Sequence, residues 1–182
     1  MSFLQPDNEL SINTAFIKRL HLEGDPDITN MAVDGSVTPQ RFIVEALDNQ
    51  ILHMLSINIT VEDNGDFDPS CWGRDVVMIN GLRLLLRVNG VEYQPMNLEI
   101  KTTAELYAIS HEYIYLNNAP AYNRMLKATW KTTENLSMIR LFPENGTPPD
   151  AFIVVVEDDL TAIFRQHVYI EGHYDPERFP LT

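Results

Sequence analysis

Apolar and polar residues alternate along most of this chain, and this pattern is typical of β-strands with one buried face. The alternation is clearest over residues 51–61, where β-branched side chains are also frequent. A nearly continuous apolar run over residues 151–157 predicts a strand that is buried on both faces. The remaining predicted strands cover residues 15–20, 40–47, 111–116, 125–132, 138–142 and 162–172.

Two Asn-Gly pairs, at residues 80–81 and 89–90, lie in an apolar stretch of the chain. Asn-Gly favours two-residue hairpin turns, because both of its residues readily adopt a positive φ. The second pair predicts three facing pairs of residues, namely Val88 with Val91, Arg87 with Glu92, and Leu86 with Tyr93. A turn at the first pair adds a strand that contains Val77 and Ile79, so we expect a three-stranded meander over residues 75–93.

Only one segment has the signals of a helix. Thr102 and Glu105 have capping-box spacing at the start of residues 103–110, which predicts a helix of about two turns. The many short strands separated by turns predict a mainly β protein. We therefore expect an antiparallel β-sandwich, with the jelly roll as one form of it, one short helix and an extended N-terminal arm.

The expected organisation is an arm over residues 1–30, a sandwich domain over residues 31–174 and a C-terminal tail over residues 175–182. The arm is polar with scattered apolar residues, and Gly24-Asp25-Pro26-Asp27 interrupts it. We expect it to lie on the domain or on a neighbouring subunit, with a frayed terminus as the alternative. Its expected interaction residues are Phe3, Leu4, Phe16 and Ile17.

The net charge of −13, from 26 acidic and 13 basic residues, limits the classes of partner. Nucleic-acid backbones require clustered Lys and Arg, so no nucleic-acid partner is expected. No apolar run reaches the length of a membrane span, and no secretory signal is visible at the start. The single cysteine, Cys71, fits a protein made in a reducing cytosol. The acidity either keeps the protein soluble or serves a partner with basic patches.

Three acidic residues in one loop, Asp63, Asp66 and Asp68, are candidates for calcium ligands. The EF-hand order is absent, and a solvated loop is the simpler interpretation. Among the five histidines, His167 and His173 share a strand face but lie about 20 Å apart in an extended strand. The sequence contains no nucleophile elbow and no phosphate loop, so we expect no catalytic residue, no metal and no cofactor.

Four segments carry a resemblance to a known class of proteins. They are Asp34-Gly35-Ser36-Val37-Thr38-Pro39 before a strand near Phe42, the acidic loop before Asn80-Gly81-Leu82, Lys101-Thr102 before the helix, and Asp158-Asp159-Leu160-Thr161 before a strand that closes on Glu171-Gly172-His173. Over residues 34–173 the chain resembles small structural proteins of tailed bacteriophage virions. The resemblance implies a non-enzymatic subunit of a tail, collar, fibre-attachment or capsid-surface assembly. Such a subunit is made in the host cytoplasm, contacts other virion proteins and forms homo-oligomers.

Two alternative functions make different structural predictions. A carbohydrate-binding sandwich requires at least two aromatic side chains in a shallow groove, and the candidates are Tyr107, Tyr113, Tyr115, Tyr122 and Trp130. The same aromatic residues also suit the core or an interface. A jelly-roll enzyme requires a carboxylate beside at least two histidines from the set His53, His111, His167 and His173.

Overall fold

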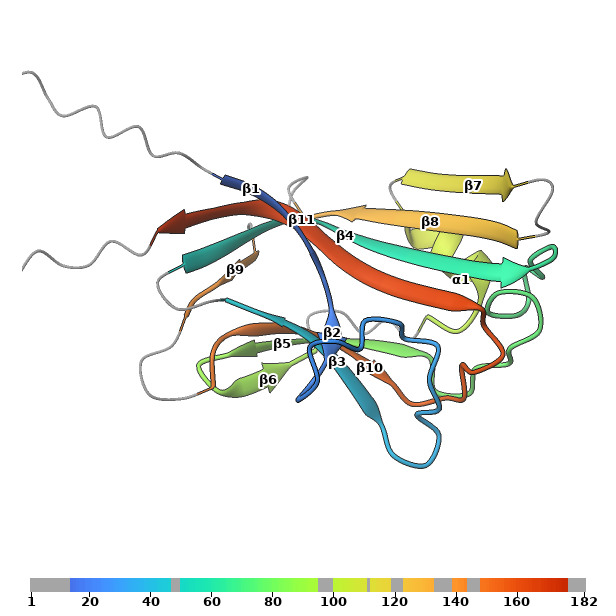
Figure 1. Ribbon diagram of the computed structural model, residues 1–182, viewed down its shortest axis with the longest axis horizontal. Coiled ribbons are helices and arrows are strands. Elements are labelled where there is room, and N and C mark those ends of the chain that lie inside the picture. Colours follow the sequence, from blue (N-terminus) through green and yellow to red (C-terminus); the bar gives the residue numbers. More distant parts are fainter. Residues whose placement is uncertain are drawn as a thin grey trace, which may run out of the picture.

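The computed structural model contains two antiparallel β-sheets that stack face to face, as Figure 1 shows. It describes residues 14–46, 50–94, 100–110, 112–118, 123–132, 139–143 and 148–176. Sheet A has the order β1-β11-β4-β8-β7, with β9 also paired to β4, and sheet B has the order β2-β3-β10-β5-β6. The predicted mainly β sandwich is confirmed, whereas this strand order does not establish the jelly-roll type.

The strands of sheet A are β1 (Thr14–Arg19), β4 (Gln50–Asn64), β7 (Glu112–Asn118), β8 (Asn123–Lys131), β9 (Ile139–Leu141) and β11 (Arg165–Pro176). The strands of sheet B are β2 (His21–Leu22), β3 (Gln40–Glu45), β5 (Leu82–Val88), β6 (Val91–Tyr93) and β10 (Ala151–Val156). The C-terminal strand continues through Pro176, so it extends into the expected tail, and residues 177–182 lie outside the described residues.

The main core lies between the two sheets and is built from every second residue of the long strands. On β4 the inward residues include Ile57, Ile59 and Val61, and on β11 they include Val168 and Ile170. The loop between β4 and β5 adds Trp72, which is fully buried. Its indole nitrogen donates a hydrogen bond of 2.7 Å to Oε1 of Gln166, which is also fully buried, so the polar edge of the tryptophan is satisfied.

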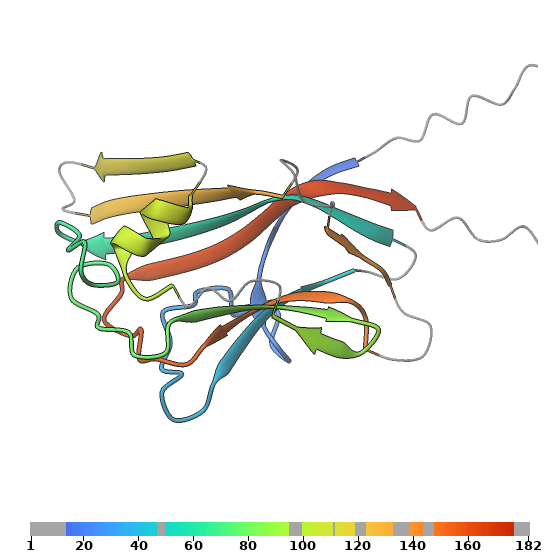
Figure 2. The same cartoon turned by 180° about the vertical axis from the view of Figure 1, so that it is seen from behind.

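The chain crosses from sheet A to sheet B between β1 and β2, with only Leu20 separating the two strands (Figures 1 and 2). Phe16 is 7% exposed and Leu20 is completely buried, so both belong to the core. Residues 14–22 are therefore part of the sandwich, whereas we expected them in an arm that ends at residue 30. Burial of these two apolar side chains explains the difference. Phe3 and Leu4 lie outside the described residues.

The hairpin between β5 and β6 has the predicted register, with Arg87 opposite Glu92 across the turn. Asn89 and Gly90 have φ values of 51° and 75°, as the predicted turn requires. The predicted meander is wrong in its first strand, because residues 75–79 do not form one. Their expected inward residues, Val77 and Ile79, are 76% and 75% exposed.

A β-bulge interrupts the alternation of β4. Glu171 of β11 faces Ser56, but its neighbour Gly172 faces Met54, so Leu55 is the extra residue. The carbonyl of Leu55 accepts a hydrogen bond from the backbone nitrogen of Thr132 at 2.9 Å. Leu55 is only half-buried, whereas Ile57, Ile59 and Val61 on the inward face are buried.

The predicted helix is confirmed as α1 (Thr103–Ile109), and both hydrogen bonds of its capping box are present. Thr102 accepts a bond from the backbone nitrogen of Glu105, whose side chain in turn accepts bonds from the start of the helix. At seven residues α1 is too short to cross a bilayer, and no other helix occurs in the described part of the chain.

The outer face of sheet B carries a second apolar cluster, which confirms that β10 is buried on both faces. Its members are Ile43, Leu85, Ala151, Ile153 and Val155. Charged side chains lie across the same face. Arg87 is paired with Glu45 at 3.0 Å, and Arg41 is paired with both Glu23 and Glu92. The aliphatic parts of these arginines are suited to cover the apolar cluster while their charges remain paired.

Candidate functional site

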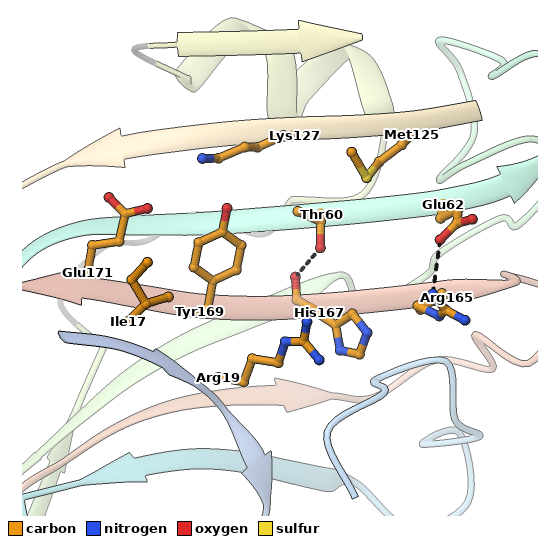
Figure 3. Close-up of a pocket in the computed structure, with 10 residues that line it drawn as sticks. All are labelled: Ile17, Arg19, Thr60, Glu62, Met125, Lys127, Arg165, His167, Tyr169 and Glu171. Atoms are coloured by element: carbon orange, nitrogen blue, oxygen red, sulfur yellow. Dashed lines mark hydrogen bonds and ion pairs between the residues drawn. The ribbon is translucent and has the colours of Figure 1, made fainter. Parts of the chain in front are cut away.

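The outer face of sheet A contains a shallow hollow of about 680 Å³ (Figure 3). Four neighbouring strands, β1, β11, β4 and β8, supply the side chains that line it. The lining residues are Ile17, Arg19, Thr60, Glu62, Met125, Lys127, Arg165, His167, Tyr169 and Glu171. A volume of this size falls in the range of binding sites for small molecules or short segments of chain. We refer to it as the sheet A hollow.

Strand register places short side chains in the middle of this face and long side chains around them. On the central strand β4, Asn58 and Thr60 face outward, and both are opposite large residues of β11. Tyr169 lies between Asn58 on one side and Arg19 on the other. The hollow therefore results from differences in side-chain size. The short side chains of β4 leave space, and the long side chains of the neighbouring strands surround it.

The short polar side chains next to the hollow on the same face form a continuous chain of hydrogen bonds. The Thr129 hydroxyl donates to Oδ1 of Asn58 at 2.8 Å, and Nδ2 of Asn58 donates to the Ser56 hydroxyl at 3.1 Å. That hydroxyl in turn donates to the Glu171 carboxylate at 3.2 Å. Asn58 is completely buried, so these bonds satisfy polar groups that would otherwise be costly to bury. The network fixes the orientation of Glu171 at the border of the hollow.

The cations around the hollow are less fully paired than its anions. Lys127 has its ammonium 5.4 Å from the centroid of the Tyr169 ring, and the Arg19 side chain has no hydrogen bond or ion pair within the described residues. Arg165 lies 3.5 Å from the Glu62 carboxylate. Among the residues that the structure describes, the hollow thus holds two cations without a carboxylate partner, on a protein whose net charge is strongly negative.

His167 is in its neutral form near pH 7. Burial lowers its pKa below the ordinary value of 6.5, and the positive charges of Arg19 and Arg165 act in the same direction. The Thr29 carbonyl and Glu62 oppose the shift but do not reverse it. Nδ1 of the ring is 2.8 Å from the Thr29 carbonyl oxygen, so a proton on that nitrogen is donated to it.

The three candidate calcium ligands have separate roles. Asp63 is buried and accepts hydrogen bonds from the backbone nitrogens of Asn64 and Arg74, whereas Asp66 pairs with Arg124 at 2.9 Å. Asp68 caps the turn at Ser70, and the two hydrogen bonds from that residue lower its pKa. The structure does not bring the three carboxylates together, and the described residues contain no group of three or more His, Cys, Asp or Glu side chains that would hold a metal ion.

Two of the four histidines considered for an enzyme are in contact. The rings of His53 and His173 stack with centroids 4.6 Å apart and planes inclined by 11°. Their meeting was missed because the histidines lie on β4 and β11, 120 residues apart, and only the register after the bulge places them side by side. His167 lines the sheet A hollow, and His111 lies outside the described residues.

The aromatic residues considered for sugar binding are dispersed. Tyr107 is on α1, Tyr115 packs edge-on against Phe67, and Trp130 packs against the core. Tyr122 and the side chain of Tyr113 are not among the described groups. Of the residues that line the sheet A hollow only Tyr169 is a tyrosine, and Lys127 lies over its ring. The hollow therefore offers little open aromatic surface for stacking on a sugar.

Two of the expected interaction residues of the arm lie in β1 and have opposite environments. Phe16 points into the core and stacks on Tyr174 with ring centroids 5.2 Å apart. Ile17 is 72% exposed at the border of the sheet A hollow, so only Ile17 is available to a partner.

The β7 edge of sheet A is open and carries exposed apolar side chains. Ile114, Tyr115 and Leu116 are each more than 40% exposed, and no described element lies beyond this strand in Figure 1 or Figure 2. The strand contains neither Lys nor Pro, the residues that commonly protect an edge from pairing with another chain. The edge of sheet B is similar, because Val91 and Tyr93 of β6 are about half exposed.

Comparisons of this chain with models of known protein families, with curated proteins and with solved structures find no match.

Proposed function

We propose that this protein is a non-enzymatic structural or adaptor subunit that works through protein–protein contacts in the virion of a tailed bacteriophage. Its place is in a tail, collar, fibre-attachment or capsid-surface assembly. The chain is made in the host cytoplasm and is then incorporated beside other virion proteins and copies of itself. The virion assignment is supported by the sequence resemblance over residues 34–173, and the mode of action by the surface of the fold.

The single observation that carries the mode of action is the open β7 edge. A strand edge offers a row of backbone N–H and C=O groups to a strand of another chain, and apolar side chains on that edge add buried area. Ile114 and Leu116 are on the same face of β7, on either side of Tyr115, so an added strand covers both. A protein with such an exposed strand edge is protected from aggregation when a partner strand covers the edge.

The test places a positive charge on this edge. A chain with both Ile114→Lys and Leu116→Lys, supplied as the only source of the protein during infection, should be absent from purified particles. The number of copies per particle is counted by quantitative mass spectrometry. Lysine at these positions opposes strand addition, because its charge would have to be desolvated against the incoming chain.

The matched control changes two exposed apolar residues that lie away from the sheet edges. Val37 and Val77 are 87% and 76% exposed in loops, so a chain with Val37→Lys and Val77→Lys has the same added charge. This control should be incorporated as well as the wild-type chain. Normal incorporation of the β7 variant, with wild-type thermal stability for both variants, would refute the role of this edge.

A further inference from the structure

We propose that the sheet A hollow binds the acidic N-terminal segment, residues 1–13, of a second copy of this chain. The inference rests on the proposed function, since it names the contact by which copies of the subunit join. It uses the charge of the hollow, the composition of the segment and the direction of β1.

The charges of the hollow favour an acidic occupant. Lys127 and Arg19 approach it from opposite sides, from β8 and β1, and neither has a carboxylate partner within the described residues. Its two carboxylates are engaged, because Glu171 accepts a hydrogen bond from Ser56 and Glu62 faces Arg165. An incoming carboxylate therefore meets two available cations and no free anion of comparable position.

The N-terminal segment matches this surface in charge and in apolar content. Residues 1–13 contain Asp7 and Glu9 and no Lys, Arg or His. The segment also contains Phe3 and Leu4, which suit the apolar side chains at the two borders of the hollow. Those border residues are Ile17 on β1 and Met125 on β8. A sugar acid shares the charge but would leave these apolar borders without a matching partner.

The direction of β1 favours a second copy over the same copy. Thr14 pairs with Tyr174 at one end of the strand, whereas Ile17 and Arg19 border the hollow further along it. Followed from Arg19 to Thr14, β1 therefore runs away from the hollow of its own copy. Thirteen extended residues span at most about 43–47 Å, which is enough to reach the same face of a neighbouring domain.

The experiment exchanges the charges of the two partners in the full-length chain. One variant carries Arg19→Glu and Lys127→Glu in the hollow, and the other carries Asp7→Lys and Glu9→Lys in the segment. We expect sedimentation equilibrium to show self-association of the wild-type chain and a rise of roughly tenfold or more in the dissociation constant of each variant alone. An equimolar mixture should recover the wild-type affinity, because each segment then meets a hollow of opposite charge.

The matched control reverses two exposed cations outside the hollow, in a chain with Arg74→Glu and Arg140→Glu. It should associate like the wild type. Wild-type association of the hollow variant overturns the proposal. A mixture that stays as dissociated as its two components also overturns the proposal, because the segment of one copy then does not bind the hollow of another. A wild-type chain that stays monomeric but binds an acidic oligosaccharide, such as a heparin tetrasaccharide, only through Arg19 and Lys127 also overturns it.

Failure of this contact can be distinguished from failure of the proposed function by combining the association experiment with the count of wild-type copies in particles. Recovery of association in the mixture, together with absence of the wild-type chain from particles, supports the contact and removes the virion assignment. Incorporation of the wild-type chain into particles, together with no recovery in the mixture, retains the assembly role and removes this contact.

Discussion

The carboxylate of Asp158 lies 2.7 Å from the backbone nitrogen of Gly81 and also accepts hydrogen bonds from the backbone nitrogens of Ile79 and Asn80. One buried side chain thus satisfies three consecutive donors at the start of β5. The predicted turn at Asn80-Gly81 leads out of this loop instead of joining two strands. Because Asp158 already accepts hydrogen bonds from the backbone nitrogens of residues 79–81, these residues do not require a partner strand.

This relationship predicts a large effect for Asp158→Asn. The substitution keeps the size of the side chain but replaces one acceptor oxygen by a donor that faces other donors. We expect the free energy of unfolding to fall by about 1–3 kcal/mol, measured by urea denaturation. Asp159→Asn is the control, because that carboxylate is exposed and caps the turn at Thr161. Equal losses for the two variants would contradict the role assigned to Asp158.

The buried pair of Trp72 and Gln166 gives a second prediction. Gln166→Leu leaves the indole N–H without its acceptor in the core, and we expect a loss of about 1–3 kcal/mol in the free energy of unfolding. Trp72→Phe alone also destabilises the protein, because it opens a cavity. The double variant should lose less than the sum of the two single losses. Strict additivity in this double-mutant cycle would argue against the hydrogen bond.

Gly172 should tolerate no side chain at the β-bulge. A Cβ at this position would lie 1.9 Å from the carbonyl oxygen of His53, a backbone atom that cannot turn away. We expect Gly172→Ala to cost about 3 kcal/mol or more, measured by thermal unfolding, because β4 and β11 must separate locally. Gly90→Ala is the comparison, since its Cβ meets nothing within 4 Å and only the left-handed backbone opposes it, at about 1 kcal/mol. Similar melting temperatures for both variants would show that the strands adjust freely.

The lowered pKa of His167 predicts a dependence of stability on pH. The unfolded chain binds a proton at this histidine more readily than the folded chain does, so the stabilising contribution is present above pH 6.5. It is lost as the pH falls from 6.5 through the lower pKa of the folded state. His167→Gln should remove this part of the pH dependence, which is measured as the free energy of unfolding at several pH values between about 5 and 8. An unchanged slope in the variant would assign the effect to other groups.

Local signals in the sequence predicted the elements that depend on nearby residues. The register of β5 and β6 follows from Asn89-Gly90, and the start of α1 follows from Thr102 and Glu105. The buried positions of Ile57, Ile59 and Val61 follow from the alternation over residues 51–61. Each of these features is fixed by a turn, a cap or a period of two, so it is visible in a short stretch of chain.

Features that depend on distant residues could not be predicted in this way. The failure of residues 75–79 to form a strand depends on Asp158, which lies about 80 residues further along the chain. The stacking of His53 on His173 depends on the extra residue Leu55, which changes the register of β4 against β11. The sheet A hollow depends on the order of four strands, and alternation alone specifies which face a residue is on but not which strand is its neighbour.

The pairing of Thr14 with Tyr174 brings the first described strand and the last one to the same end of the sandwich. A pulling force applied between the two ends of the chain would therefore open the β1–β11 ladder one hydrogen bond at a time, as a zipper opens. A force applied between the N-terminus and the opposite end of β11 would load the whole ladder at once. The protein should accordingly resist tension well in one geometry of attachment and yield easily in the other.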